Sequence, residues 1–305
     1  MNIQRIVIWG LRKRYHTHRH IHKAFYENAL KLGYKAIWVE DEKENVSLIQ
    51  SGDLIIAAGA IGKMVPEKLT FEDYNLPVRE DVFYCLHNYK NIFTEKLNPR
   101  RYLNLVVYRD HEFEKSEVEQ WGPVTYFDKN KRSLYQPWGT NLLAHEFGKP
   151  VFNRGKFVFW IGSIWNDKDN HGNLEQIKEL REALEKYYIY FVHVRFVPDL
   201  INKLLVRISR IAPAIAGRSQ VEENYLPCRV FKNVSYGQLG ITNVKKFKEI
   251  FGSAFVEGNT IEELIHNALL LDEKTYKEKV LAQQEIVKNY TYKQSLENII
   301  RAILS

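Results

Sequence analysis

Short apolar runs alternate with amphipathic segments from the start of the chain, and this alternation restricts the possible folds more than any other feature. Residues 6–9 form an apolar run that ends at Gly10, a pattern typical of a strand buried on both faces of a parallel sheet. Apolar residues then recur at helical spacing between residues 21 and 32, Gly33 takes a C-cap position, and residues 36–39 form a second apolar run. This order predicts a right-handed βαβ unit.

The alternation continues in two series, which predicts an α/β fold made of two Rossmann-like, doubly wound domains. The first series adds apolar runs that predict strands at residues 53–58, 82–86 and 105–108. The second series opens with a strand at residues 157–161, and further strands are predicted at residues 188–194, 211–215 and 240–241. Between them, a helix is predicted with Leu174, Ile177, Leu180 and Leu184 on one side, and Thr260 with Glu263 predicts a capping box at the start of a later helix.

Proline and glycine interrupt the pattern around residues 135–141 and again at residues 149–155, as is usual at a domain boundary. A chain of 305 residues is also longer than one hydrophobic core usually supports. We therefore expect an N-terminal domain at residues 1–145 and a C-terminal domain at residues 146–305, with the option that the last helix crosses back to the N-terminal domain. The carboxyl ends of the two sheets are expected to face each other across a cleft.

The net charge indicates the kind of partner to expect, and the cysteine content indicates the cellular compartment. The formal net charge of +7, with a pI near 9.1, predicts attraction to phosphate-bearing ligands, an anionic membrane surface or nucleic acid. Cys85 and Cys228 lie in or beside apolar segments and are expected to be buried thiols in a reducing compartment. No apolar run is long enough to span a bilayer and no signal peptide is visible, so we expect a soluble, cytoplasmic protein.

A histidine-rich segment follows the first predicted strand. It contains His16, His18, His20 and His22. Alternate histidines share one face of an extended chain and could bind zinc or nickel, but no carboxylate or cysteine accompanies them, so no metal is expected. Because the segment begins at the end of a central strand, a histidine there could act as a general base or donate to an anionic substrate. The alternative is that these are solvated residues at the entry to a helix.

The stretch from residue 226 to residue 243 combines an arginine with several small and polar residues. Arg229 opens a helical turn, Ser235 and Gly237 introduce a kink, and a short apolar run ends in Thr242-Asn243. This pattern predicts a ledge lined by loops that suits an anionic ligand. Upstream, Arg218-Ser219 follows Gly217 and could hold a diphosphate, with Glu222 or Glu223 accepting ribose hydroxyls; a plain surface turn is the alternative.

Several common motifs are missing from the sequence. No G-x-G-x-x-G follows the first strand of either series, which argues against a nicotinamide or flavin cofactor. The Walker A, G-x-S-x-G and H-E-x-x-H motifs are also missing, so ATPase, α/β-hydrolase and zinc-protease functions have no sequence support. Aromatic and basic residues are interleaved at several places, a composition that suits sugars or single-stranded nucleic acid, but most of the aromatic residues lie in apolar runs and are expected to pack the core.

The stretch 226–243, with the segment 245–251 and the helix predicted at 261–271, resembles the C-terminal domain of GT-B-fold glycosyltransferases, as in the glycosyl transferase group 1 family. The matching positions are Arg229, Phe231, Gly237, Thr242 and Asn243, and the segment 287–292 also fits. Lys232-Asn233 departs from the pattern, because many retaining members carry an acidic residue there. Residues 6–10, with His16, His18 and Ile21-His22, look like the corresponding N-terminal loop of glycosyltransferase-like proteins. Residues 136–139 look like their interdomain linker.

The resemblance implies metal-independent transfer of a sugar from a nucleotide-diphosphate sugar to a glycan or a lipid-linked saccharide, as in polysaccharide biosynthesis. The C-terminal domain would bind the donor, and the N-terminal domain would bind the acceptor. Arg218, Arg229 or Lys232 would offset the charge of the departing diphosphate. The remaining donor-binding residues would be Gly162, Ser163, Ser219, Ser235, Tyr236, Gly237, Gln238, Thr242 and Asn243.

His16, His18 or His22 would orient or deprotonate the acceptor hydroxyl in an inverting reaction, and would bind the donor sugar or phosphate in a retaining one. No cofactor is expected, because the nucleotide sugar is a substrate. The basic N-terminal loop could make a peripheral contact with an anionic membrane, and no nucleic acid is expected as a partner. The alternative function is a nucleic-acid or polyanion binding protein on an α/β scaffold, with the basic loops as its footprint.

Overall fold

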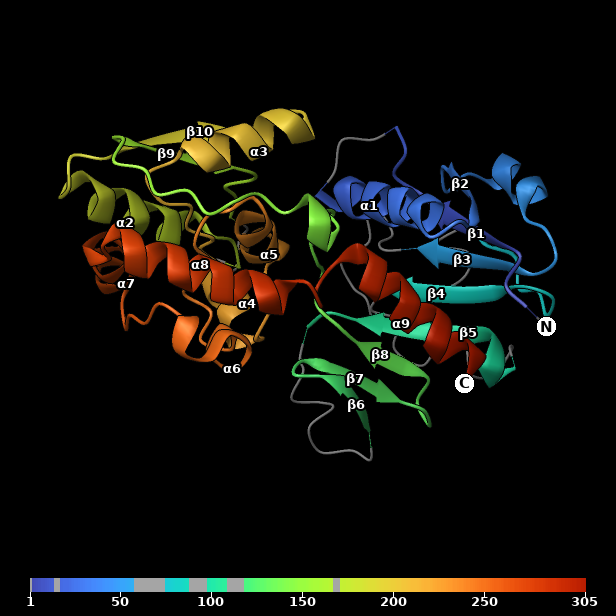
Figure 1. Cartoon of the computed structure of the whole chain (residues 1–305). Coiled ribbons are helices and arrows are strands. Elements are labelled where there is room, and N and C mark those ends of the chain that lie inside the picture. Colours follow the sequence, from blue (N-terminus) through green and yellow to red (C-terminus); the bar gives the residue numbers. More distant parts are fainter. Residues whose placement is uncertain (1, 14–16, 58–74, 88–97, 109–117, 167–170) are drawn as a thin grey trace. The chain divides into compact units, whose positions relative to one another are not determined.

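The computed structural model describes residues 2–13, 17–57, 75–87, 98–108, 118–166 and 171–305 (Figure 1). The chain divides into two compact units. The first unit consists of Met1–Asn141 together with Tyr292–Ser305, and the second unit is Leu142–Thr291. The chain's last helix therefore belongs to the first unit, although the rest of that unit precedes residue 142.

The described residues of the first unit contain a sheet of eight strands in the order β2-β1-β3-β4-β5-β8-β7-β6. All neighbouring pairs from β2 to β8 are parallel, and β7 and β6 extend the sheet as antiparallel strands. The strands are β1 (Arg5–Trp9), β2 (Lys35–Val39), β3 (Asp53–Ala57), β4 (Phe83–His87), β5 (Tyr102–Val106), β6 (Glu119–Gly122), β7 (Thr125–Asp128) and β8 (Ser133–Tyr135). The mixed α/β fold with a sheet dominated by parallel strands is confirmed.

The central strands are apolar without interruption because both faces of this sheet are covered. Every residue of β3 is buried, and Val7 of β1 lies in register with Ile37 on one side and Ile55 on the other. The last predicted strand of the first series was placed at residues 105–108, but β5 begins earlier, at Tyr102. The difference arises because Tyr102 and Leu103 pair with Tyr84 and Cys85 of β4.

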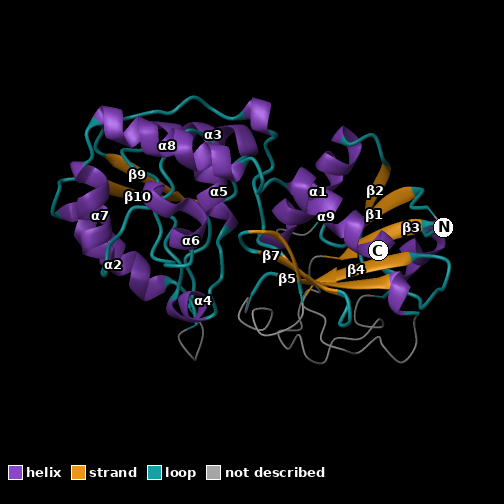
Figure 2. Cartoon of the chain, turned by 60° about the horizontal axis from the view of Figure 1, so that its bottom comes forward, coloured by secondary structure: helices purple, strands orange, loops and turns teal. Residues whose placement is uncertain are grey.

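Two helices from opposite ends of the chain lie side by side in the first unit (Figure 2). They are α1 (Thr17–Lys31) and α9 (Tyr292–Leu304). The ring of Phe25 in α1 packs edge-on against Tyr292, with 5.1 Å between the ring centroids. Buried polar contacts also hold α9 in place, because Gln136 donates to the Ser295 carbonyl over 3.1 Å.

The second unit has a smaller sheet. Strand β9 (Phe157–Ile161) pairs in parallel with β10 (Tyr190–Val194), and α2 (Leu174–Glu185) connects them. Val158 and Trp160 of β9 pack in one core with Leu180 and Leu184 of α2. The other helices are α3 (Asp199–Ile208), α4 (Arg218–Glu222), α5 (Cys228–Ser235), α6 (Phe247–Phe251), α7 (Ile261–Leu270) and α8 (Glu273–Val287).

The strands predicted at residues 211–215 and 240–241 are reduced to one isolated parallel bridge, between Pro213 and Ile241. Proline has no backbone N–H to donate to a ladder. Side chains also take the place of ladder partners, since Gln283 accepts from the Gly240 N–H over 2.8 Å and donates to its carbonyl over 3.3 Å. The chain direction of a parallel sheet is kept, but its regular hydrogen bonding is not.

Local signals for helix starts and thiols were mostly correct. Thr260 caps α7 by accepting from the Glu263 N–H over 3.1 Å, and the Glu263 carboxylate accepts from the Asn259 N–H over 2.8 Å. Both cysteines are free thiols; Cys85 is buried, but Cys228 is only partly buried because it opens α5 directly after Pro227. Among the described helices, none is both long enough and apolar enough to cross a membrane.

Candidate functional site

The loop that leaves β9 approaches another helix unusually closely. Gly162 has φ +140°, a backbone conformation that residues with a side chain rarely adopt. A Cβ atom at this position would overlap Nη2 of Arg229. The Gly162 carbonyl accepts a hydrogen bond from His193 Nε2 over 2.7 Å, which holds the loop against the end of β10. Glycine is therefore required here, because only glycine lets the guanidinium of Arg229 lie against the backbone.

Arg229 lies in the first turn of α5 and reaches back to β9. Its Cζ is 3.8 Å from the ring centroid of Trp160, close enough for a cation–π contact. The residue keeps some exposed surface, but its Nη1 is buried and has no hydrogen-bond partner among the described residues. The indole Nε1 of Trp160 is also buried and has no partner in the part of the chain that the structure describes. Two buried donors at one place in the second unit are thus unsatisfied.

Burial lowers the pKa of Arg229 to about 10, so the guanidinium still carries its charge at neutral pH. Electrostatic interactions with Cys228 and Tyr225 act in the opposite direction and raise the pKa of Arg229, and no carboxylate of the described residues pairs with it. A buried cation without a partner is costly, by several kcal/mol in order of magnitude. Proteins retain such groups where a ligand or reaction supplies the missing charge. The arrangement is therefore suited to binding an anion.

Two asparagine side chains fix the neighbouring loops. Asn173 accepts from the Trp165 N–H over 3.1 Å and donates to the Ser163 carbonyl over 3.3 Å, which closes the loop after β9. Asn243 accepts from the Ala216 N–H over 2.8 Å and donates to the Ala216 carbonyl over 2.9 Å. These side-chain bonds hold the backbone that follows Pro213 and Ile241 in the same way that a ladder would.

These loops all follow the carboxyl ends of parallel segments. Gly162 follows β9, Ala216 follows the bridge at Pro213, and Asn243 follows the bridge at Ile241. They touch one another, because Ser219 Oγ donates to the His171 carbonyl over 2.7 Å and a Cβ on Gly217 would overlap the Gly172 carbonyl. Open α/β sheets bind ligands at this edge. Arg229 and Trp160 thus lie where the fold places a binding site.

The structure separates the predicted donor-binding residues into two groups. Gly162, Ser163, Arg229, Thr242 and Asn243 belong to the carboxyl edge just described, although Thr242 is buried and its Oγ1 accepts from the Val244 N–H. The other group lies in the turn after α5, which is the amino edge. This group consists of Ser235, Tyr236, Gly237 and Gln238.

Contacts of that turn show its position. Gln238 is fully buried and donates to the Ser209 carbonyl over 2.9 Å. Arg210, which follows Ser209, donates its backbone N–H to the carbonyl of Phe157 at the start of β9. The Tyr236 carbonyl accepts from Arg207, and Gly237 packs against the Lys149 carbonyl. Because α5 runs opposite to the strands, its first turn and its last turn lie at opposite edges of the unit. The side chains in the last turn are used to hold the fold.

The remaining predicted donor residues are more exposed. The side chain of Arg218 is 81% exposed and pairs with Glu222 in the same helix, with 2.9 Å between Nε and Oε1. Ser219 contacts the His171 loop as described. Lys232 is half-buried in α5, and its carbonyl accepts from Ser235 Oγ over 2.8 Å.

The histidines of the first unit have different surroundings. His22 is fully buried, and its Nδ1 lies 2.7 Å from the Gly10 carbonyl, which also accepts from Trp38 Nε1 over 2.8 Å. Because a carbonyl only accepts, Nδ1 of His22 carries the proton. The His18 ring lies 5.7 Å from the ring of His87, edge to face. His16 lies outside the described residues.

His18 and His87 lie near the point where the strand order of the sheet reverses. The order β2-β1-β3 changes direction between β1 and β3, and such a switch point is the usual ligand site of a doubly wound sheet. His18 lies in the first turn of α1, and His87 ends β4 and packs on Trp138 with 5.0 Å between ring centroids. In the described part of the chain, no three metal-ligating side chains form a group.

Sequence reasoning missed Trp160 and His87. Trp160 lies inside a predicted strand and was assigned to the core; its burial was predictable, but its unpartnered Nε1 was not. His87 did carry a signal, because it directly follows the predicted strand 82–86 and so falls at a carboxyl edge. A histidine at that position merits the same consideration as the histidines after the first strand.

Comparison with known proteins finds the fold but no close relative. No family model and no curated protein sequence matches the chain. Among solved structures, one match is an alpha-glucosyltransferase in complex with UDP and a 13-mer DNA containing a HMU base, with a TM-score of 0.58 and 10% identity over 97% of this chain and 99% of that chain.

A second match is the N-terminal domain of trehalose-6-phosphate phosphatase from Candida albicans, with a TM-score of 0.52 and 10% identity over 99% of this chain and 96% of that chain. At this identity the similarity establishes the fold only. The chain therefore shares its mixed α/β fold, over nearly its whole length, with a structure of an alpha-glucosyltransferase and with the N-terminal domain of a sugar-phosphate phosphatase.

Proposed function

We propose that the chain transfers a sugar from a nucleotide-diphosphate sugar to a glycan or lipid-linked acceptor, and that the second unit binds the donor. The observation that carries the proposal is the buried guanidinium of Arg229, whose Nη1 has no partner among the described residues, at the carboxyl edge of parallel segments. The similarity in fold to a glucosyltransferase structure that contains UDP supports it. The net charge of +7 is also favourable for an anionic donor.

In this proposal the diphosphate of the donor binds against Arg229 and Trp160. An acceptor hydroxyl oxygen attacks the anomeric carbon, the bond from that carbon to the phosphate oxygen breaks, and the electron pair stays on the diphosphate. Arg229 then offsets the charge that develops on the leaving group, and Trp160 Nε1 donates a second hydrogen bond. Because both groups are buried, their interaction with the diphosphate is stronger than it would be in water.

The acceptor is assigned to the first unit. There His18, beside His87, is the histidine we propose to receive the acceptor's proton if the reaction inverts the anomeric centre. His22 has a different part, since its Nδ1–H is bound to the Gly10 carbonyl and positions the loop after β1. In a retaining reaction His18 would instead bind the sugar or its phosphate.

A panel of nucleotide sugars tests the proposal. Release of nucleoside diphosphate from each donor is measured for the full chain, for Arg229→Ala, and for the control Arg218→Ala. Arg218 is a matched control because it is a nearby arginine that is exposed and already paired. We expect one donor to be turned over, with a loss of about 100-fold or more in Arg229→Ala and little change in Arg218→Ala.

Two results would contradict this function. The first is that no nucleotide sugar in the panel is cleaved or stabilises the protein. The second is equal activity in the two arginine variants. If instead RNA or DNA binds with a steep salt dependence while nucleotides have no effect, the chain is a polyanion-binding protein.

A further inference from the structure

Helix α3 in the second unit exposes a stripe of large apolar side chains. Leu200, Leu204 and Ile208 are spaced four residues apart and are 76%, 51% and 49% exposed, and Ile201 beside them is 40% exposed. Just before the helix, Phe196 is 70% exposed. Residues at this spacing lie on one face of a helix. The apolar face of α3 therefore points to solvent.

The opposite face of α3 holds the helix on the unit. Val206 is buried and packs with Ala212 and Tyr236, against which Ile161 of β9 also lies. Figure 1 shows α3, in yellow, running alongside β9 and β10. The other long helices of this unit bury their main apolar residues, such as Leu180 in α2 and Leu264 in α7. Among the described residues of the second unit, the stripe on α3 is thus left exposed.

The exposed apolar surface continues onto the sheet. Phe157 of β9 and Tyr190 of β10 are paired in register, are 48% and 62% exposed, and have ring centroids 5.6 Å apart. Side chains alternate between the faces of a strand, so Phe157 lies on the same face as Ile161. Ile161 packs against the cluster that contains Val206 of α3. The stripe and these two rings therefore lie on one side of β9 and β10.

The chain segments that carry this surface are rich in basic residues. Residues 149–161 and 189–210 contain one acidic residue, Asp199, against seven basic ones: Lys149, Arg154, Lys156, Arg195, Lys203, Arg207 and Arg210. Arg154, Lys156 and Arg195 are exposed. A second copy of the chain would bring the same positive surface and would be repelled, whereas an anionic surface would be attracted. The charge therefore selects the kind of partner.

We propose that α3, with Phe196 and the pair Phe157–Tyr190, docks the protein onto an anionic lipid membrane. The helix lies in the interface, its leucine and isoleucine side chains enter the acyl boundary, and the flanking basic residues contact anionic headgroups. This inference is separate from the proposed nucleotide site, because that site is assigned to Arg229 and Trp160, and neither residue is part of this surface. Its failure would leave the proposed transfer reaction unaffected.

Vesicle co-sedimentation of the full chain tests this surface. Vesicles of phosphatidylcholine mixed with phosphatidylglycerol are compared with vesicles of phosphatidylcholine alone. The test variant is Leu200→Glu with Leu204→Glu, and the matched control is Leu270→Glu with Leu281→Glu, which are leucines of α7 and α8 that are 68% and 51% exposed. We expect binding to the mixed vesicles only, and at least about tenfold weaker binding in the test variant than in the control.

Charge gives a second, independent readout. Arg195→Glu and Lys203→Glu should each weaken binding to the anionic vesicles by about fivefold, and added salt should weaken the wild type in the same way. Thermal unfolding of each variant checks that the fold is intact. The proposal is overturned if the wild type does not bind the anionic vesicles, or if the test variant binds them as tightly as the control variant does. It is also overturned if sedimentation shows a dimer that Leu200→Glu dissociates, because the occupant would then be a second copy.

Discussion

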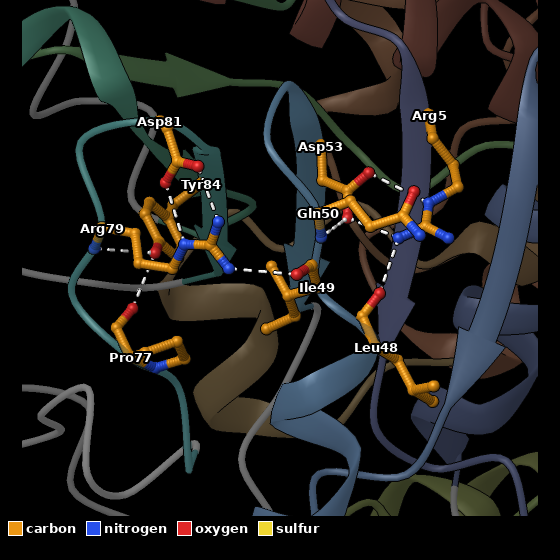
Figure 3. Close-up of polar contacts among 9 residues, drawn as sticks. All are labelled: Arg5, Leu48, Ile49, Gln50, Asp53, Pro77, Arg79, Asp81 and Tyr84. Carbon is orange, nitrogen blue, oxygen red and sulfur yellow. Dashed lines mark hydrogen bonds and ion pairs between the residues drawn. The ribbon is translucent and has the colours of Figure 1, made fainter.

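Two sets of arginines in this protein differ in what surrounds them. At the amino edge of the first unit's sheet, Arg5 donates to both carboxylate oxygens of Asp53 over 3.0 and 2.7 Å and to the Leu48 carbonyl over 2.7 Å (Figure 3). Arg79 makes the same kind of fork with Asp81, over 2.8 and 2.6 Å, and donates to the Ile49 carbonyl over 3.0 Å. Each of these guanidinium groups is satisfied within the chain.

Arg229 in the second unit is more deeply enclosed and yet has an unpartnered Nη1. The first set holds the fold together, because paired carboxylates and carbonyls offset the cost of placing a charge near the core. Arg229 has the cation–π contact with Trp160, but among the described residues its Nη1 has no hydrogen-bond acceptor to offset the cost of burial. The contrast supports our proposal that Arg229 binds an anionic ligand, and it can be tested by changing a residue at each of the two sites.

The largest expected effect is on the free energy of unfolding when the Arg5–Asp53 pair is broken. Asp53 is almost fully buried and also accepts from the Gln50 N–H over 2.7 Å. Asp53→Ala leaves Arg5 without its carboxylate, with only the Leu48 carbonyl still accepting from it, and leaves the Gln50 N–H without its acceptor. We expect a loss of about 3 kcal/mol in the free energy of unfolding. Urea denaturation measures it. A loss below about 1 kcal/mol would mean that the pair is not a structural one.

The next effect concerns the approach of Arg229 to the backbone. Gly162→Ala would put a Cβ into the place of Nη2 and would strain a backbone with φ +140°. We expect nucleoside diphosphate binding to weaken by about tenfold or more, because the guanidinium is displaced. Calorimetric titration gives the affinity, and Gly155→Ala is the control because no atom lies within 4 Å of its Cβ position. Equal affinity for nucleoside diphosphate in the two variants would mean that Gly162 does not contribute to the binding site.

A smaller effect is expected at the loop that Asn243 holds. Asn243→Ala removes both hydrogen bonds to Ala216, and we expect a loss of about 1–2 kcal/mol in the free energy of unfolding. Nucleotide affinity should fall with it if the loops at this edge position the donor. A variant that loses stability but binds nucleotide normally would show that this loop lies outside the site.

The smallest expected effect is on the pH dependence of stability, at the Arg79–Asp81 pair. The hydrogen bond from Arg79 holds the pKa of Asp81 below its ordinary value. The pair therefore contributes stability above the ordinary aspartate pKa of about 4, and this contribution disappears as the pH falls through the lower pKa of the folded state. Asp81→Asn should flatten the dependence of Tm on pH in the acid range only. An unchanged pH profile would contradict the structural role of the pair.

The sequence predicted the parts of the fold that depend on local pattern. Apolar runs located the central strands of the first unit, because strands buried on both faces need apolar residues at every position. Thr260 and Glu263 predicted the start of α7, because a capping box acts within one turn. Arg229 was predicted to bind an anion from its position at the start of a helical turn, and this stays a prediction.

Other features depend on contacts distant in the sequence. The turn at Ser235–Gln238 was grouped with Arg229 by proximity along the chain, but α5 carries the two to opposite edges. Residues 211–215 and 240–241 have the composition of strands, but side-chain bonds from distant residues hold this backbone in place of a ladder, from Gln283 to Gly240 and from Asn243 to Ala216. The outward face of α3 was also beyond prediction, because periodicity identifies an apolar face without showing which way it points.

One measurement tests the central claim most directly: thermal unfolding of the wild type and of Arg229→Met, each with and without a panel of nucleoside diphosphates. Methionine keeps much of the side-chain volume and removes the buried charge. We predict that one nucleoside diphosphate raises the Tm of the wild type, and that the variant without nucleotide unfolds at the same temperature or higher and gains nothing from that nucleotide. The account is contradicted if Arg229→Met is strongly destabilised without nucleotide and still responds to the nucleotide that stabilises the wild type, because Arg229 would then belong with the structural arginines.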